Sequence, residues 1–75
     1  MSDYRARAVD RGVVCIEHYA GESFDAAVQA AVTLAPFTRY DVIVVNADGI
    51  DYDCADGLTA DERETVDVAV TEARR

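Results

Sequence analysis

The acidic segment that ends at Glu62 holds the best candidates for binding a ligand in this sequence. Asp51, Asp53 and Asp56 offer carboxylate oxygens. Glu62 is the twelfth residue counted from Asp51, which is the spacing of a calcium-binding loop. The rest of that pattern does not fit, because Ala55 takes the fifth position, where an oxygen ligand is needed, and Asp56 takes the sixth, where glycine makes the turn. The sequence therefore favours a solvated acidic turn over a calcium site, and we predict no metal and no cofactor.

Cys15, His18 and Cys54 are the residues whose chemistry could serve zinc binding or nucleophilic catalysis. Side chains alternate between the two faces of a strand, so Cys15 and His18 are expected on opposite faces, where one metal ion does not readily reach both. The favoured interpretation of the cysteines is small, buried or half-buried thiols that stay reduced in the cytoplasm. No residue pattern gives His18 a positioned catalytic partner, although a pH-sensing role for it stays open. We predict no catalytic residue and no enzymatic activity.

Arg5, Arg7 and Arg11 lie on or beside one expected hairpin and could contact phosphate. The chain carries fifteen acidic residues against seven arginines, for a net charge of −8. This balance disfavours direct binding to nucleic acid or to anionic membranes. Cross-strand pairing with acids such as Glu17 is therefore the preferred role for these arginines.

The first half of the chain predicts a hairpin followed by a helix. Residues 4–8 and 13–20 alternate as strands do, and Asp10-Arg11-Gly12 between them resembles a three-residue hairpin loop. Ser23 is a suitable N-cap for a helix that ends before Pro36.

The register of this hairpin can be predicted from its two faces. With Val9 opposite Val13, Arg7 lies opposite Cys15 and Arg5 opposite Glu17 on a charged face. Ala6 then lies opposite Ile16 on an apolar face, as a one-sided antiparallel sheet requires.

The second half repeats this order. Residues 41–47 are the most strand-like stretch, and Asp48-Gly49 is a typical two-residue hairpin turn. Ile50–Cys54 is expected to return as a fourth strand. Thr59 and Glu62 form a capping box before the second helix.

Together these elements predict a single α+β domain over residues 1–75. The expected order is ββαββα, with one mainly antiparallel four-stranded sheet, the first strand in its interior, and both helices on one face. The expected core joins the helices to the sheet: Phe24, Val28, Ala31, Leu34, Val66 and Val70 against Ala6, Ile16, Val42 and Val44. The thin core, and a first helix that is apolar around most of its circumference, predict a homodimer.

The acidic residues are concentrated in the second half, where ten of them lie between residues 41 and 73 beside Arg63. Such a surface repels phosphate and attracts basic proteins. We therefore predict a small, non-enzymatic binding protein that engages a basic protein surface, in the extreme as a nucleic-acid mimic or inhibitor. The predicted partner-binding residues are Asp48, Asp51, Asp53, Asp56, Asp61, Glu64 and Asp67.

A second hypothesis explains the same acidity without a dedicated partner. Arginine is the only strong cation in the chain, and this composition indicates a GC-rich coding sequence, as in some phages, mobile elements and salt-adapted cells. The alternative is a salt-adapted structural or regulatory homodimer whose acidity is a compositional trait. No stretch of eighteen apolar residues and no basic-then-apolar leader is present, so we expect a cytoplasmic protein without a membrane span.

Overall fold

A β-hairpin opens the fold. In the computed structural model, which describes residues 2–49 and 57–75, β1 (Tyr4–Asp10) and β2 (Val13–Gly21) pair in antiparallel fashion. Arg11 and Gly12 alone connect them, and both have positive φ values, of 53° and 82°. The loop is thus a tight two-residue turn, one residue shorter than predicted. Glycine suits the second position because it has no Cβ to clash there.

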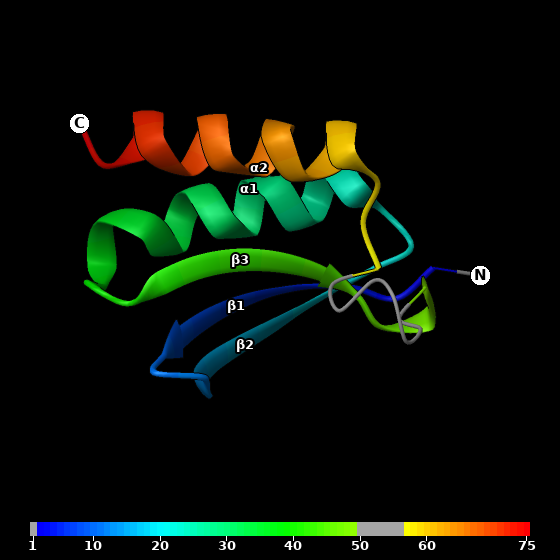
Figure 1. The fold of residues 1–75 in the computed structure, drawn as a ribbon, viewed down its shortest axis with the longest axis horizontal. Coiled ribbons are helices and arrows are strands. Elements are labelled where there is room, and N and C mark those ends of the chain that lie inside the picture. The colour runs from blue at the N-terminus through cyan, green and yellow to red at the C-terminus, as the bar shows by residue number, and fades with distance from the viewer. Residues whose placement is uncertain (1, 50–56) are drawn as a thin grey trace.

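Among the described residues, three strands form the sheet, in the order β2-β1-β3, with β3 at Asp41–Asn46 (Figure 1). The prediction that the first strand lies in the interior is confirmed, since β1 pairs with both neighbours in antiparallel fashion. The prediction of four strands in a ββαββα order is wrong. After β3 the chain enters a short 3₁₀ helix, η2 (Ala47–Gly49), instead of the predicted hairpin turn at Asp48-Gly49. The predicted fourth strand, Ile50–Cys54, lies outside the described residues.

The predicted hairpin register is also wrong, although the predicted faces are confirmed from Arg5 to Ala8. Arg7 lies opposite Glu17 and Arg5 opposite Tyr19, a shift of two residues on β2. Two irregularities on β2 leave Cys15 and Ala20 without an opposite residue on β1. From Arg5 to Ala8 the shift of two residues keeps each side chain on its predicted face, because strand side chains alternate with a period of two. Beyond the irregularity at Cys15 the shift is one residue, so Val14 lies opposite Val9 and not opposite Ala8 as predicted, on the other face of the hairpin.

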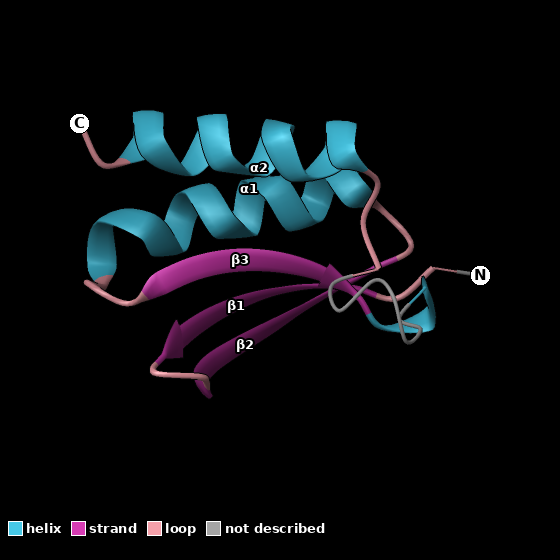
Figure 2. Ribbon diagram, in the orientation of Figure 1, coloured by secondary structure: helices cyan, strands magenta, loops and turns pink. Residues whose placement is uncertain are grey.

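Both helices lie on one face of the sheet, as predicted (Figures 1 and 2). Helix α1 (Phe24–Leu34) covers β1 and β2, whereas α2 (Ala60–Ala73) lies beside α1 and contacts β3. The Ser23 hydroxyl accepts a hydrogen bond from the Ala26 amide at 3.1 Å, which confirms the predicted N-cap. The α1 segment passes into a 3₁₀ helix, η1 (Ala35–Phe37), where Pro36 cannot continue the α-helical hydrogen bonds.

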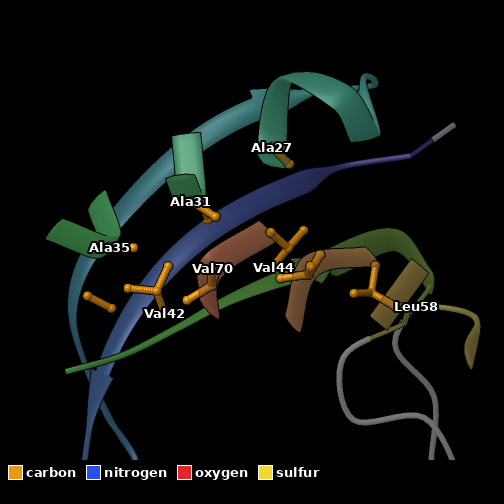
Figure 3. Packing of buried hydrophobic residues seen from close by; sticks show 10 residues of the cluster. Ala27, Ala31, Ala35, Val42, Val44, Leu58 and Val70 are labelled. Atoms are coloured by element: carbon orange, nitrogen blue, oxygen red, sulfur yellow. The ribbon is translucent and has the colours of Figure 1, made fainter. Parts of the chain in front are cut away.

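Small side chains let α1 approach the sheet closely. Ala6 and Ala8 of β1 and Ala27 and Ala31 of α1 are all 0 % exposed. Ala27 and Ala31 of α1, with Ala35 of η1, form what we call the alanine row. Figure 3 shows this row facing the branched side chains that come from β3 and α2. The predicted core is confirmed for its helical residues and for Ala6, Val42 and Val44, but Ile16 is 41 % exposed and lies largely outside it. Leu58, which we did not predict, is 5 % exposed and belongs to the core.

Candidate functional site

The exposed face of α2 carries three of the predicted partner-binding residues. Asp61, Glu64 and Asp67 are all exposed, because the helix buries Val66 and Val70 on its other side. Glu72 is exposed on the same solvent side. We call the group Asp61, Glu64, Asp67 and Glu72 the acidic α2 face.

An apolar side chain lies in the middle of this face. Val68 is 51 % exposed, although valine is usually buried. Residues four apart on a helix are neighbours on its surface, so Glu64 and Glu72 flank Val68 one turn before and one turn after it. Shallow surface depressions beside Val68 are lined by Asp61, Glu64, Asp67 and Glu72, and also by Arg75 at the C-terminal end of the helix. The acidic α2 face thus surrounds one exposed apolar contact point.

Three of the arginines make contacts away from this face, whereas Arg63 lies on α2 itself and Arg75 lines one of the depressions beside Val68. Arg5 and Arg7 are engaged on the sheet, and Arg74 donates to the backbone carbonyls of Ala35, Thr38 and Tyr40 at the end of α1. The ion pairs recorded among residues 2–49 and 57–75 lie on the sheet, between Arg5, Arg7, Asp3 and Glu17. The acidic α2 face exposes four carboxylate side chains to solvent.

The remaining predicted partner-binding residues are not all placed. Asp48 is exposed on η2, at the end of β3 and beside β1. Asp51, Asp53 and Asp56 lie outside the described residues. The structure thus brings Asp61, Glu64 and Asp67 together on one helix and puts Asp48 on a separate element.

Glu62, the twelfth residue of the calcium-like spacing, has a structural role. Its Oε1 accepts from the Thr59 amide at 3.0 Å, and the Thr59 hydroxyl accepts from the Glu62 amide at 3.2 Å, which confirms the predicted capping box. Its Oε2 accepts from the Tyr4 hydroxyl at 3.1 Å. The same carboxylate thus begins α2 and ties it to β1, while the Tyr4 ring packs edge-on against Phe24 with centroids 5.5 Å apart.

A second polar cluster lies on the sheet face opposite the helices. Arg5 contacts Asp3 at 2.7 Å and Glu17 at 3.2 Å, and Arg7 also pairs with Glu17. The Arg5 guanidinium lies 4.6 Å from the centre of the Tyr19 ring, a cation–π contact. The predicted pairing of these arginines with Glu17 is confirmed. The Tyr19 contact was missed because it depends on the shifted register.

These ion pairs change the acidity of both carboxyl groups. Hydrogen bonding from Arg5 holds the pKa of Asp3 below its usual value. For Glu17, partial burial raises the pKa, but the hydrogen bond from Arg7 and the charges of both arginines outweigh it, so that the net pKa is lowered. A lowered folded-state pKa stabilises the fold above the unfolded pKa, and this contribution is lost as the pH falls through the folded pKa.

We therefore expect the stability advantage of the natural chain over Glu17→Gln to depend on pH. At pH 7 the natural chain should unfold at the higher temperature, because glutamine cannot form the charged pairs. The gap should close as the pH falls below about 4, where carboxyl groups of ordinary acidity take up protons. Thermal unfolding of both proteins from pH 7 to pH 3 measures the gap. A gap that stays constant over this range would mean that the ion pairs do not stabilise the fold.

Cys15 and His18 are both exposed on β2. The expectation that Cys15 is buried or half-buried is wrong, because Cys15 is the extra residue of a β2 irregularity. Its thiol approaches the Val13 carbonyl oxygen at 3.6 Å. His18 lies opposite Ala6 of the buried face and lines a groove between β2 and α1. Cys54 lies outside the described residues.

Within residues 2–49 and 57–75, no helix is long and apolar enough to cross a membrane, and no three or more histidine, cysteine, aspartate or glutamate side chains are grouped so that they could hold a metal ion. Comparisons with protein-family models, with curated proteins and with solved structures found no match.

Proposed function

We propose that this chain is a non-enzymatic binding protein whose acidic α2 face engages a basic surface on a partner protein. The observation that carries the proposal is the exposed Val68, which has exposed carboxylates on both sides of it along α2. Acids that served charge alone would not need an exposed valine at their centre. An apolar contact point inside a ring of like charge is the arrangement of a protein-binding surface.

The helical form of this face limits what fits it. A single convex helix offers a strip of carboxylates at helical spacing. The complementary surface is a basic segment that presents arginines around a small apolar depression. The remaining acids of the chain add a long-range field, which speeds the encounter with such a segment and repels nucleic acid.

The salt-adapted alternative predicts a different effect of the same carboxylates on binding. If acidity were only a compositional trait, the position of a carboxylate on the surface would not matter. Binding to a basic probe would then follow the net charge of the chain alone.

A defined probe separates these two hypotheses. We expect a fluorescently labelled helical peptide of leucine, alanine and arginine to bind the natural chain, with an affinity that falls steeply between 50 and 300 mM salt because screening weakens charge attraction. The double variant Glu64→Gln, Glu72→Gln should bind about tenfold more weakly, since each removed charge contributes about 0.7 kcal/mol at an exposed pair. Fluorescence anisotropy titrations measure both effects.

The matched control changes the same net charge elsewhere. Asp10 and Asp41 are exposed at the other end of the sheet, where Asp41 lies opposite Val9. The double variant Asp10→Asn, Asp41→Asn should lose less than about twofold in affinity, through the long-range field alone. Equal losses in the two double variants would favour the compositional explanation, and salt-independent binding would rule out charge recognition.

A further inference from the structure

We infer that β2 and the adjoining side of α1 form a self-complementary interface, through which two copies of this chain join their sheets edge to edge. The inference concerns a different surface from the acidic α2 face and does not depend on the proposed function. It begins from the edge of the sheet. Among the described residues, β2 pairs only with β1, so that the backbone groups along its other side are free to pair with a strand.

The side chains of β2 are unusual for an exposed edge. Four of the eight large apolar residues that are exposed in the described part of the chain lie on it: Val13, Val14, Ile16 and Tyr19. Natural edge strands are commonly protected by lysine, by proline, by shortness or by β-bulges. The β2 strand has nine residues and contains neither lysine nor proline. Its two irregularities, at Cys15 and Ala20, flank a regular segment from Ile16 to Tyr19.

The same edge continues into a groove beside α1. This groove is lined by Ile16 and His18 of β2 and by Ala26, Ala30, Thr33 and Leu34 of α1, among others. Small residues on α1 permit a second helix to approach closely. Because α1 covers β1 and β2 while α2 contacts β3, edge-to-edge pairing through β2 places α1 of one copy beside α1 of the other (Figure 1).

Charge selects a second copy as the occupant of this edge. Each chain carries a net charge of −8, so two copies repel unless they meet at a face without net charge. The β2 edge is such a face, because Glu17 is paired with Arg5 and Arg7 and the groove residues of α1 are neutral. Pairing through β2 also keeps the two acidic α2 faces at opposite ends of the assembly.

The available area is sufficient for a specific contact. A paired segment of seven residues centred on His18 runs from Cys15 to Gly21, passes both irregular positions and leaves Val13 and Val14 beyond its end. Such a segment is about 24 Å long, and a sheet with one helix layer is about 20 Å high. These dimensions fit within the molecule, whose extents are 31 × 24 × 20 Å. The flat area is about 500 Å² per copy, or about 1,000 Å² in total, which reaches the lower limit for a specific interface.

One register satisfies the side chains best. A two-fold axis through the sheet must place one residue opposite its own copy, so that the faces match. An axis at Glu17 would oppose like charges, and an axis at Ile16 or Tyr19 would bring an irregular residue into the first pairs. An axis at His18 avoids both problems. It also sets Glu17 opposite the Tyr19 of the second copy, over which Arg5 of that copy is stacked.

Mass measurements test the interface. We expect sedimentation at 200 µM to give twice the 8.2 kDa chain mass, or 16.4 kDa. Ile16→Lys should raise the dimer dissociation constant at least about tenfold, because a charge on an edge strand opposes pairing. Val68→Lys, the same kind of change at a similarly exposed residue of α2, should leave dimerisation unchanged. A monomeric natural chain, or a dimer that is disrupted by Val68→Lys and not by Ile16→Lys, would overturn the inference.

A second variant guards against loss of folding. Ala26 is exposed at the third position of α1, and its amide already donates to Ser23. Ala26→Glu creates a capping box, which should preserve or raise helix stability while it puts a charge in the groove. We expect a folded monomer, shown by an unchanged circular dichroism spectrum and a halved mass. A folded dimer of Ala26→Glu would exclude the groove from the interface.

Cross-linking tests the register. Residues opposite each other in the closer kind of antiparallel pair have Cα atoms about 4.5 Å apart, within the range that a disulfide can bridge. In a chain with Cys15→Ser and Cys54→Ser, His18→Cys should form a disulfide dimer at least about tenfold faster than Val68→Cys under the same glutathione buffer, because pairing raises the effective concentration. Equal rates for the two thiols would overturn the His18-centred register.

Discussion

Replacing Ala31 with leucine is expected to destabilise the folded chain by about 2–3 kcal/mol, because an enlarged side chain in a tightly packed core displaces its neighbours. Ala31 is 0 % exposed, and it belongs to the alanine row by which α1 approaches β1 (Figure 3). A domain of this size has a total stability of about 3–5 kcal/mol. The variant should therefore unfold about 10–20 °C below the natural chain.

The matched control for this change is Ala60→Leu. Ala60 is exposed at the first position of α2, so the same three added carbons meet solvent there. We expect a change within about 0.5 kcal/mol, as is usual for surface positions. Thermal melts followed by circular dichroism compare the two variants at equal concentration. Similar melting temperatures for Ala31→Leu and Ala60→Leu would contradict the tight packing of Ala31, because they would show that the core accepts a leucine there.

The helices could be predicted from sequence because their boundaries are encoded locally. Ser23 and Thr59 accept hydrogen bonds from amides three residues ahead, and Pro36 ends the α-helical hydrogen bonding of α1. These effects act within one turn and depend little on the rest of the fold. The apolar stripe of each helix then determined which side is buried, as the burial of Val66 and Val70 shows.

The hairpin register could not be predicted in the same way. Side-chain alternation determines the face of each residue, but it is unchanged by a shift of two positions. Ala6 and Ala8 are equally small, so the apolar face gave no preference between them as the partner of Ile16. The irregularity at Cys15 has no glycine beside it, whereas the one at Ala20 adjoins Gly21, which has a positive φ of 68° and was not interpreted as a bulge signal.

The fourth strand was predicted from Asp48-Gly49, a pair of residues that is compatible with more than one kind of turn. Aspartate followed by glycine is common in two-residue hairpins, but the same residues also suit a 3₁₀ turn, and Asp48 and Gly49 adopt that form in η2. Two aspartates in the segment that follows made a strand unfavourable from the start. Among the described residues, β3 is the outermost strand on this side of the sheet.

The candidate site likewise has residues that the sequence could predict and residues that it could not. Exposure of Asp61, Glu64 and Asp67 follows from helical spacing and is confirmed. Val68 was missed, although it lies two positions from both buried valines of α2 and is therefore turned away from them. The Arg5–Tyr19 contact was out of reach, because it requires the correct register.

Replacing Val44 with alanine is expected to cost about 2–3 kcal/mol, since it removes two buried methyl groups and leaves a cavity. Val44 is 2 % exposed on β3, in the core cluster that also contains Val66 and Val70 of α2. The matched control is Val13→Ala, the same change at a β2 residue that is 64 % exposed, where we expect a loss of about 0.5 kcal/mol. Urea unfolding with a constant slope in denaturant measures both losses.

The Val44→Ala variant also separates stability from binding. The acidic α2 face points away from β3, because α2 buries Val66 and Val70 towards the sheet. Below its unfolding temperature, Val44→Ala should therefore bind the arginine-containing peptide with an affinity within about twofold of the natural chain, despite the lost methyl contacts. Equal losses of stability in Val44→Ala and Val13→Ala would contradict the layered packing of α2 on β3. A large loss of peptide affinity in a folded Val44→Ala variant would place the peptide against β3 and not on the outer side of α2.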